Sequence, residues 1–242
     1  SGRSIDWPRG KILGGTSSIN GLLYIRGQHQ DYDHWRQLGN TGWSYEDVLP
    51  YFKRSEDQQN GADDFHGKGG GLSVQNIRAK RDICEALIDA AEELGLPRND
   101  DFNGVKQEGA GYFQQTARDG LRCSTARAFL NPVKNRSNLK IIVHALVEKV
   151  VVEGAKTIGI AISVKGAPRQ YWLKPGGEVI LSAGAIGSPQ ILQLSGIGPG
   201  ALLQGLEIPV VKALAGVGAN LQDHLQIRTV YEVNVPTLNE EI

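Results

Sequence analysis

The chain has 242 residues, with 26 lysines and arginines against 26 aspartates and glutamates, so its formal charge at pH 7 is zero. This balance gives no electrostatic basis for binding nucleic acid or an anionic membrane surface. The 31 glycines are about 13% of the residues, against a usual share of about 7%, which indicates many tight turns and close approaches of the backbone.

A chain of this length can bury a hydrophobic core, either as one large domain or as parts of two. Cys84 and Cys123 lie far apart and lack metal-binding spacing, so we expect both thiols to be reduced. This favours a cytoplasmic protein, with association to a membrane left open. No signal peptide is visible, and no apolar run approaches the roughly 18 residues of a membrane span. Because the chain has no methionine, we expect it to be an internal part of a longer protein.

The first informative segment is PRGKILGGTSSINGLLYIRGQHQD, residues 8–31. Gly14 and Gly15 have no Cβ, so they can adopt positive φ and bring main-chain N–H groups close to a planar or anionic ligand. Hydrogen-bonding side chains follow at Thr16, Ser17, Ser18 and Asn20. The residues support two interpretations, a glycine turn followed by a helix cap or the wall of a ligand site.

Residues 31–59 predict two short helices separated by Gly39–Asn40. Ser44 is predicted to cap the second helix, with Asp47 in the place of the usual glutamate of a capping box. His29 and His34 have no third ligand at helical spacing, so no metal site is predicted.

Residues 60–71 are rich in glycine, aspartate and lysine and predict an exposed loop at a domain boundary. A short strand is predicted at 72–75, and a helix over 82–94 that ends at Gly95. A strand over 111–117 and a short helix over 122–132 follow.

Four β-branched runs then predict a meander of strands, at residues 140–154, 157–164, 170–174 and 178–184. His144 alternates with apolar neighbours in the first of these strands, which favours a structural role.

Residues 179–198, VILSAGAIGSPQILQLSGIG, predict a buried strand, a tight turn and a helix. Ser188 is the expected cap of this helix, Pro189 its first residue, and residues 196–198 its end. The free N–H groups at such a helix start form a site for a phosphate or another anion.

Three stretches together resemble the glucose–methanol–choline (GMC) family of flavin oxidoreductases. The first family signature matches at Gly10, Gly14, Gly15, Thr16, Ser17, Ile19, Asn20, Tyr24, Gly27 and Asp31. The second matches at Gly184, Ser188, Pro189, Ile191, Leu192, Ser195, Gly196, Ile197 and Gly198. GVGANLQDHL at 216–225 also resembles the family, and two signatures in the right order with this third stretch are hard to explain by chance.

The resemblance implies an α/β fold, α+β in its second part, with a Rossmann-like FAD-binding domain that contains the β-meander and with part of a substrate domain. It implies that residues 1–71 and 119–225 belong to the FAD-binding domain, the former with the flavin-covering segment, that 72–118 belong to the substrate domain, and that 226–242 begin a return to it.

The resemblance also implies which residues lie near FAD. They are Ile12, Gly14, Gly15, Thr16, Ser17, Asn20, Gly21, Leu22, Leu23, Val147 and Gly184. Because Ile19 stands where some family members carry a histidine joined to the flavin, it implies FAD held without a covalent bond.

Two expected features of such an enzyme are missing. There is no GxGxxG followed about 20 residues later by an acidic residue. In the family the catalytic histidine lies in a C-terminal segment beyond this chain, so no catalytic residue is predicted among the five histidines, His29, His34, His66, His144 and His224.

Similarity is closest to bacterial choline and alcohol dehydrogenases. It implies part of an enzyme that transfers hydride from the CH–OH group of a primary alcohol or choline to flavin, with the electron acceptor undecided between dehydrogenase and oxidase. Two alternatives stay open, a hydroxynitrile-lyase-like flavoprotein without redox chemistry and a fragment unable to hold FAD.

Overall fold

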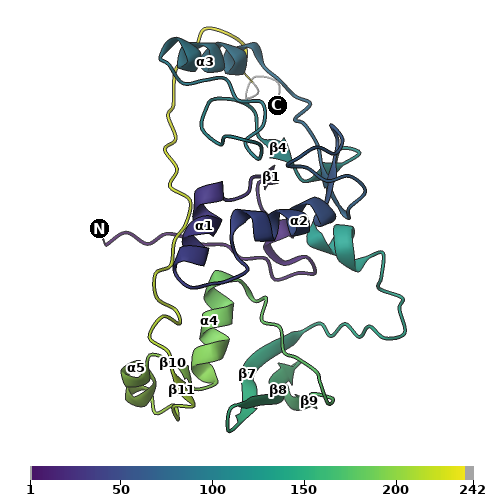
Figure 1. The fold of residues 1–242 in the computed structure, drawn as a ribbon, viewed down its shortest axis with the longest axis vertical. Coiled ribbons are helices and arrows are strands. Elements are labelled where there is room, and N and C mark those ends of the chain that lie inside the picture. The colour runs from purple at the N-terminus through teal and green to yellow at the C-terminus, as the bar shows by residue number, and fades with distance from the viewer. Residues whose placement is uncertain (1, 238–242) are drawn as a thin grey trace. The chain divides into compact units, whose positions relative to one another are not determined.

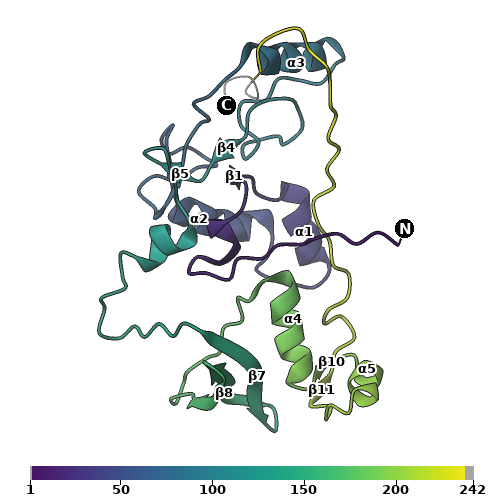
Figure 2. The ribbon, with the colours of Figure 1, turned by 180° about the vertical axis from the view of Figure 1, so that it is seen from behind.

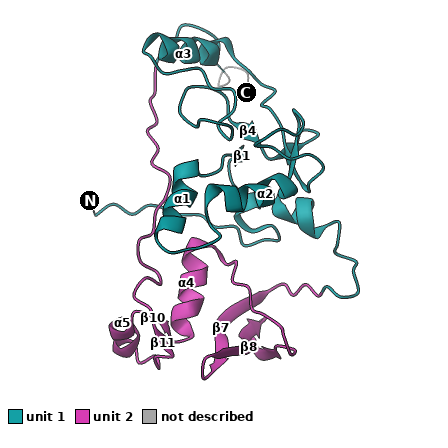
Figure 3. Ribbon diagram, viewed as in Figure 1, with its two compact units in different colours: residues 1–139, 232–242 teal, residues 140–231 magenta. Residues whose placement is uncertain are grey.

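The computed structural model describes residues 2–237. They divide into two compact units, unit 1 within residues 1–139 and 232–242 and unit 2 at residues 140–231 (Figure 3).

Unit 1 is built from short elements that run from the purple to the teal part of the ribbon in Figure 1. In chain order they are the 3₁₀ turn η1 (Gly15–Ser18), β1 (Leu23–Tyr24), α1 (His29–Gln37), α2 (Tyr45–Ser55), β2 (Glu56–Gln58), β3 (Leu72–Val74), α3 (Asp82–Glu93), β4 (Gln114–Gln115), β5 (Ala117–Arg118), β6 (Leu121–Arg122) and the π-helical turn η2 (Ala126–Leu130). The strands form pairs: β1 with β4 and β5 with β6 antiparallel, β2 with β3 parallel.

The two helices predicted within 31–59 are confirmed as α1 and α2, which pack together. Tyr32 of α1 is buried, and its ring meets the ring of Phe52 in α2 edge-on at 5.8 Å. The predicted capping box at the start of α2 is also confirmed: Ser44 N–H donates to Asp47 Oδ2 (3.0 Å) and Asp47 N–H donates to Ser44 Oγ (3.3 Å). Aspartate therefore closes the box that a glutamate usually closes.

Replacing the cap residue tests the contribution of this box. We expect Ser44→Ala to lower the free energy of unfolding by about 1 kcal/mol, because one helix-terminal N–H loses its acceptor. Ser44→Gly should cost only a few tenths of a kcal/mol, about what replacement of a cap by glycine costs elsewhere. Urea unfolding of both variants measures the losses, and a Ser44→Ala chain as stable as the wild type would contradict the role of the cap.

The prediction of α3 is confirmed, with Gly95 in the left-handed region (φ +88°) just past its end. The strand predicted over 111–117 is interrupted and appears as β4 and β5. Its partner β1 is only two residues long because Leu22 has φ +68°, which ends the extended conformation there. The helix predicted over 122–132 is reduced to η2, since Cys123 N–H bonds to Thr116 O and keeps the preceding residues in the β5–β6 hairpin.

The loop at 60–71 is packed more closely than its composition predicts. The prediction of an exposed loop is wrong at His66 and Gly67, which are buried. A Cβ on Gly67 would lie 1.8 Å from Lys53 O, so the backbone of the loop touches the backbone of α2. Charged neighbours such as Asp64 and Lys68 give the segment its polar composition, although its centre is internal.

Unit 2 contains the β-meander and two helices, seen from behind in Figure 2. Its elements are β7 (Ala145–Glu153), β8 (Lys156–Val164), β9 (Ala167–Trp172), α4 (Gly184–Leu194), β10 (Ile197–Gly198), α5 (Gly200–Gly205) and β11 (Lys212–Ala213). The order β7-β8-β9 is antiparallel throughout, and β10 pairs parallel with β11.

The core of unit 2 joins α4 to the meander. Val150, Ile162 and Ile191 are buried. Ser195, at the end of α4, accepts a hydrogen bond from Val150 N–H at 2.8 Å, so a side chain takes the place of a strand partner.

Three predictions for unit 2 are wrong. Residues 178–184 form no strand, and Ile180 is 82% exposed, because no strand within residues 2–237 lies beside it to complete its hydrogen bonds. The helix α4 begins at Gly184 rather than at Ser188, whose Oγ accepts from Ala183 N–H. His144 precedes β7 with φ +52°, since its carbonyl closes the end of the β7–β8 pair with Lys165 N–H.

Candidate functional site

The glycine-rich segment of unit 1 folds into a compact loop around η1. Gly14 and Gly15 both have positive φ, +92° and +54°. A Cβ on Gly10 would lie 2.1 Å from Gly15 O, and one on Gly14 would lie 2.5 Å from Ser18 Oγ. Gly10 and Gly14 are therefore required by the packing of the loop itself.

The polar side chains of this loop are engaged within the protein. Ser17 Oγ donates to Gly14 O and accepts from Thr125 N–H (2.9 Å), which joins η1 to η2. Asn20 Oδ1 accepts from Arg122 Nη1 (2.8 Å) and from Leu22 N–H (3.2 Å). These side chains fix the shape of the loop.

Two other glycines of the segment face open space. A Cβ at Gly15 or at Gly21 would meet no atom within 4 Å. Gly21 also lacks the positive φ that would demand glycine. Nearby, Ile12 is 63% exposed and Leu23 49% exposed. The loop thus presents bare backbone and apolar side chains on a surface that its own fold leaves uncovered.

The remaining predicted cofactor residues differ in setting. Thr16 Oγ1 accepts from Gly10 N–H at 3.2 Å. Val147 and Gly184 belong to unit 2, the first half-buried in β7 at a register irregularity, the second at the start of α4 with an open Cβ position.

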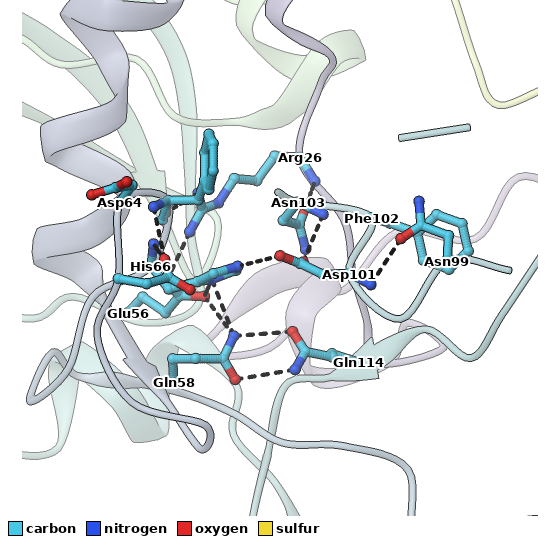
Figure 4. A network of polar contacts seen from close by, with 12 residues as sticks. Arg26, Glu56, Gln58, Asp64, His66, Asn99, Asp101, Phe102, Asn103 and Gln114 are labelled. Atoms are coloured by element: carbon cyan, nitrogen blue, oxygen red, sulfur yellow. Dashed lines mark hydrogen bonds and ion pairs between the residues drawn. The ribbon is translucent and has the colours of Figure 1, made fainter. Parts of the chain in front are cut away.

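A buried polar cluster lies at the far end of the strand that follows the loop (Figure 4). Arg26 Nη2 forms an ion pair with Glu56 Oε2 at 2.9 Å, with both side chains almost fully buried. The ring of His66 lies between Glu56 and Asp101, with Nδ1 3.1 Å from Glu56 Oε1 and Nε2 3.0 Å from Asp101 Oδ2. The Asp101 side chain is 42% exposed, whereas those of Arg26, Glu56 and His66 are buried. We call Arg26, Glu56, His66 and Asp101 the buried quartet, after its three internal members.

Amide side chains complete the cluster. Gln58 and Gln114 exchange two hydrogen bonds, of 3.0 and 3.1 Å, so β2 is joined to β4. Asn103 Oδ1 accepts from Arg26 N–H at 2.7 Å and its Nδ2 donates to Tyr24 O. The main chain at the end of β1 is therefore held by side chains from the 99–107 loop.

The quartet shifts the ionisation of its members. Burial lowers the pKa of His66, but hydrogen bonds to the Asp101 and Glu56 carboxylates outweigh it and raise the pKa to about 9. Burial raises the pKa of Asp101, but the hydrogen bonds from His66 and from Asn103 N–H hold it below its ordinary value. Both shifts favour a charged pair.

The amino-acid sequence from residue 1 to 226 matches the family model described as GMC oxidoreductase. The chain belongs to the GMC oxidoreductase family. This match confirms the family membership that the glycine signatures predicted.

Similar GMC relatives carry the name "Oxygen-dependent choline dehydrogenase". The Pseudomonas fluorescens (strain SBW25) protein is 44% identical over 238 residues, 97% of this chain and 42% of its own length. The Pectobacterium carotovorum subsp. carotovorum (strain PC1) protein is 46% identical over 237 residues, again 97% of this chain and 42% of its own length. The chain therefore spans about two-fifths of the length of the curated relatives that it matches.

Solved structures agree on the α/β fold class, which is confirmed. Pyridoxine 4-oxidase from Mesorbium loti matches with TM-score 0.80 and 30% identity over 86% of this chain and 41% of its own. An FAD-dependent oxidoreductase from Chaetomium thermophilum matches with TM-score 0.82 and 32% identity over 88% of this chain and 39% of its own.

Sequence reasoning missed the buried quartet of this GMC chain. Its members lie in separate charged or glycine-rich stretches. The strand β2 (Glu56–Gln58) is polar at every position, so its hydropathy gives no sign that Glu56 and Gln58 are buried.

Within residues 2–237 no helix is long and apolar enough to cross a bilayer, and no group of three metal-ligating side chains could hold a metal ion.

Proposed function

We propose that the segment from Ile12 to Leu23 forms part of the wall of an FAD site in an oxidoreductase. The observation that carries this proposal is the open backbone at Gly15 and Gly21 on a loop whose hydroxyl and amide side chains are already engaged. A bulky planar ring needs an uncovered backbone and apolar neighbours, and the exposed Ile12 and Leu23 supply the latter. The residues present fit the cofactor.

Each residue of the loop then has a separate role. Gly10 and Gly14 allow the loop to close on itself, whereas Gly15 and Gly21 leave room for the ligand. Thr16, Ser17 and Asn20 hold the wall in place through hydrogen bonds to backbone and to η2. Leu22 carries the chain from the wall into β1. Val147 and Gly184, which belong to unit 2, are proposed FAD neighbours on the family resemblance alone.

The proposed reaction is oxidation of the CH–OH group of choline or another primary alcohol. FAD supplies the electron sink, accepting hydride from the substrate carbon. The names of the curated relatives support choline, and the chain covers about two-fifths of the length of each. No catalytic residue is assigned to it. A cytoplasmic location, expected from the free Cys84 and Cys123, is part of the proposal.

The division of roles along the chain is proposed as well. Residues 1–71 and 119–225 serve the FAD-binding domain, and 72–118 with 226–242 the substrate domain. Residues 238–242 lie outside the described part of the chain.

Flavin content tests the proposal directly. We expect the enzyme that contains this chain, saturated with FAD and freed of excess, to show the visible flavin spectrum and an intact mass without added flavin. Acid should release all the flavin, because Ile19 offers no nucleophile for a covalent bond. Flavin that stays with the precipitated protein would contradict non-covalent binding, and an enzyme that takes up none would contradict the site.

Reduction by substrate distinguishes an oxidoreductase from a non-redox flavoprotein. Anaerobic addition of choline to the enzyme that contains this chain should bleach the flavin. Bound flavin that no alcohol reduces would favour the lyase-like alternative.

A further inference from the structure

His66 lies where its charge state decides the geometry of the buried quartet. We propose that His66 is a positioning residue that is protonated at physiological pH, an imidazolium that holds the main chain at the end of the flavin wall in place. This inference rests on the proposed function for its consequence on flavin, but its statement about His66 stands on the geometry alone.

Hydrogen-bond balance supports the imidazolium. His66 Nε2 lies 3.0 Å from Asp101 Oδ2, and Nδ1 lies 3.1 and 3.2 Å from the two oxygens of Glu56. A neutral ring carries one N–H, so one of its nitrogens would place a lone pair against a carboxylate. Both contacts are favourable only when both nitrogens carry protons.

A competing arrangement is visible and can be weighed. His66 Nδ1 also lies 3.1 Å from Gln58 Nε2, from which an unprotonated Nδ1 could accept. That nitrogen of Gln58 already donates to Gln114 Oε1 and approaches Glu56 Oε1. Gln58 keeps a partner in either case. Glu56 accepts from the ring only when Nδ1 carries a proton, and Asp101 only when Nε2 does, so the geometry favours the imidazolium.

Charge balance points the same way. Arg26 and a protonated His66 carry two positive charges, and Glu56 and Asp101 carry two negative ones. With a neutral ring the four side chains would carry one excess negative charge. Because the Asp101 side chain is 42% exposed, water solvates part of that charge, so charge balance supports the imidazolium less strongly than the hydrogen bonds do.

Other titratable groups facing His66 leave this balance unchanged. Asp63 Oδ1 accepts from the main-chain N–H of His66 at 2.7 Å and borders the exposed side of the loop. Tyr24, whose hydroxyl accepts from Arg26 Nε, has a pKa raised above its ordinary value by burial and stays neutral at physiological pH.

A chain of hydrogen bonds links the ring to the wall. Asp101, held by His66, accepts from Asn103 N–H at 3.0 Å through its other oxygen. Asn103 Oδ1 in turn accepts from Arg26 N–H, and Asn103 Nδ2 donates to Tyr24 O. Tyr24 directly follows Leu23, the last residue of the flavin wall. Loss of the proton from His66 would release Asp101 and, through Asn103, the main chain of residues 24–26.

The sign of the pH effect follows from the raised pKa. The pairing of protonated His66 with Asp101 and Glu56 stabilises the folded chain fully below pH 6.5, the ordinary pKa of histidine. This stabilisation is lost as the pH rises through about 9, the pKa of His66 in the folded chain.

Nitrogen NMR of the wild-type chain tests the proposal without any mutation. At pH 8 both ring nitrogens of His66 should show the chemical shifts of an imidazolium, and the Arg26 amide resonance should titrate together with the ring near pH 9. One unprotonated ring nitrogen at pH 8, or an Arg26 amide that ignores the titration, would overturn it.

A variant pair provides the second measurement. Between pH 7 and 9.5 the folding equilibrium constant of the wild type should fall by about 50-fold more than that of His66→Gln, which has no charge to lose. His34→Gln, at an exposed position of α1, should keep the wild-type pH profile. Parallel profiles for wild type and His66→Gln would overturn the proposal.

The two proposals fail separately. Flavin retention should decline over the same pH range in the wild type. A chain that shows the imidazolium and the coupled Arg26 amide but binds no flavin at pH 7 supports the role of His66 and refutes the flavin wall.

Discussion

Gly21→Val is expected to reduce the flavin content of the chain at least about tenfold while leaving the fold intact. The fold tolerates the change because a Cβ at Gly21 meets no atom within 4 Å and the backbone there does not have positive φ. The proposed flavin site should not tolerate it, because a branched side chain would stand where the ring is expected to approach the backbone. Loss of about 1.4 kcal/mol of binding energy is already a tenfold loss of affinity.

Gly21 gives a sharper test than Gly15. With φ +54°, Gly15 would impose backbone strain on any side chain, so loss of flavin and loss of stability would be mixed. Gly205, at the end of α5 and likewise without atoms within 4 Å, provides the matched control.

The measurement is flavin bound per folded chain, with circular dichroism to confirm folding. Gly205→Val should bind FAD as the wild type does. Wild-type flavin occupancy in a folded Gly21→Val chain would show that the cofactor lies against another part of the protein.

Arg26→Met is expected to lower the free energy of unfolding by about 3–5 kcal/mol, the usual cost of breaking a buried ion pair on one side. The guanidinium donates to Glu56, to Phe65 O and to the Tyr24 hydroxyl, and its side chain is 2% exposed. Methionine retains much of the volume but leaves the Glu56 charge without its arginine.

Two further variants decide whether charge is the cause. Arg98→Met removes an arginine whose ion pairs with Glu85 and Asp89 are at the surface, and should cost at most about 1 kcal/mol. Adding Glu56→Gln to Arg26→Met should recover part of the lost stability, because the double variant no longer buries the carboxylate charge that the Arg26 guanidinium had paired with.

Urea unfolding measures the wild type, these three variants and Glu56→Gln alone. A loss for Arg26→Met no larger than that for Arg98→Met would contradict the importance of the buried quartet. A double variant as unstable as the sum of its single changes would show that the two side chains act independently.

Local signals determined many of the short-range features. Ser44 with Asp47 defines the start of α2, and Gly95 ends α3, because capping and left-handed turns depend on residues within one helical turn. Alternation of β-branched residues was enough to predict β7 and β8. The glycine signatures gave the family, since a close ligand contact restricts a contiguous run of residues.

Tertiary structure decided what depends on distant partners. Residues 178–184 have the composition of a buried strand, but a strand exists only where a neighbour accepts its hydrogen bonds. Asn20 and Ser17 looked available to a ligand until Arg122 and Thr125, about a hundred residues away, engaged them. Glu56, His66 and Asp101 looked like surface charges for the same reason. The burial of Glu56 and His66 is stabilised only when separate segments bring Arg26 and the partly exposed Asp101 against them, and no local pattern in the sequence encodes that meeting.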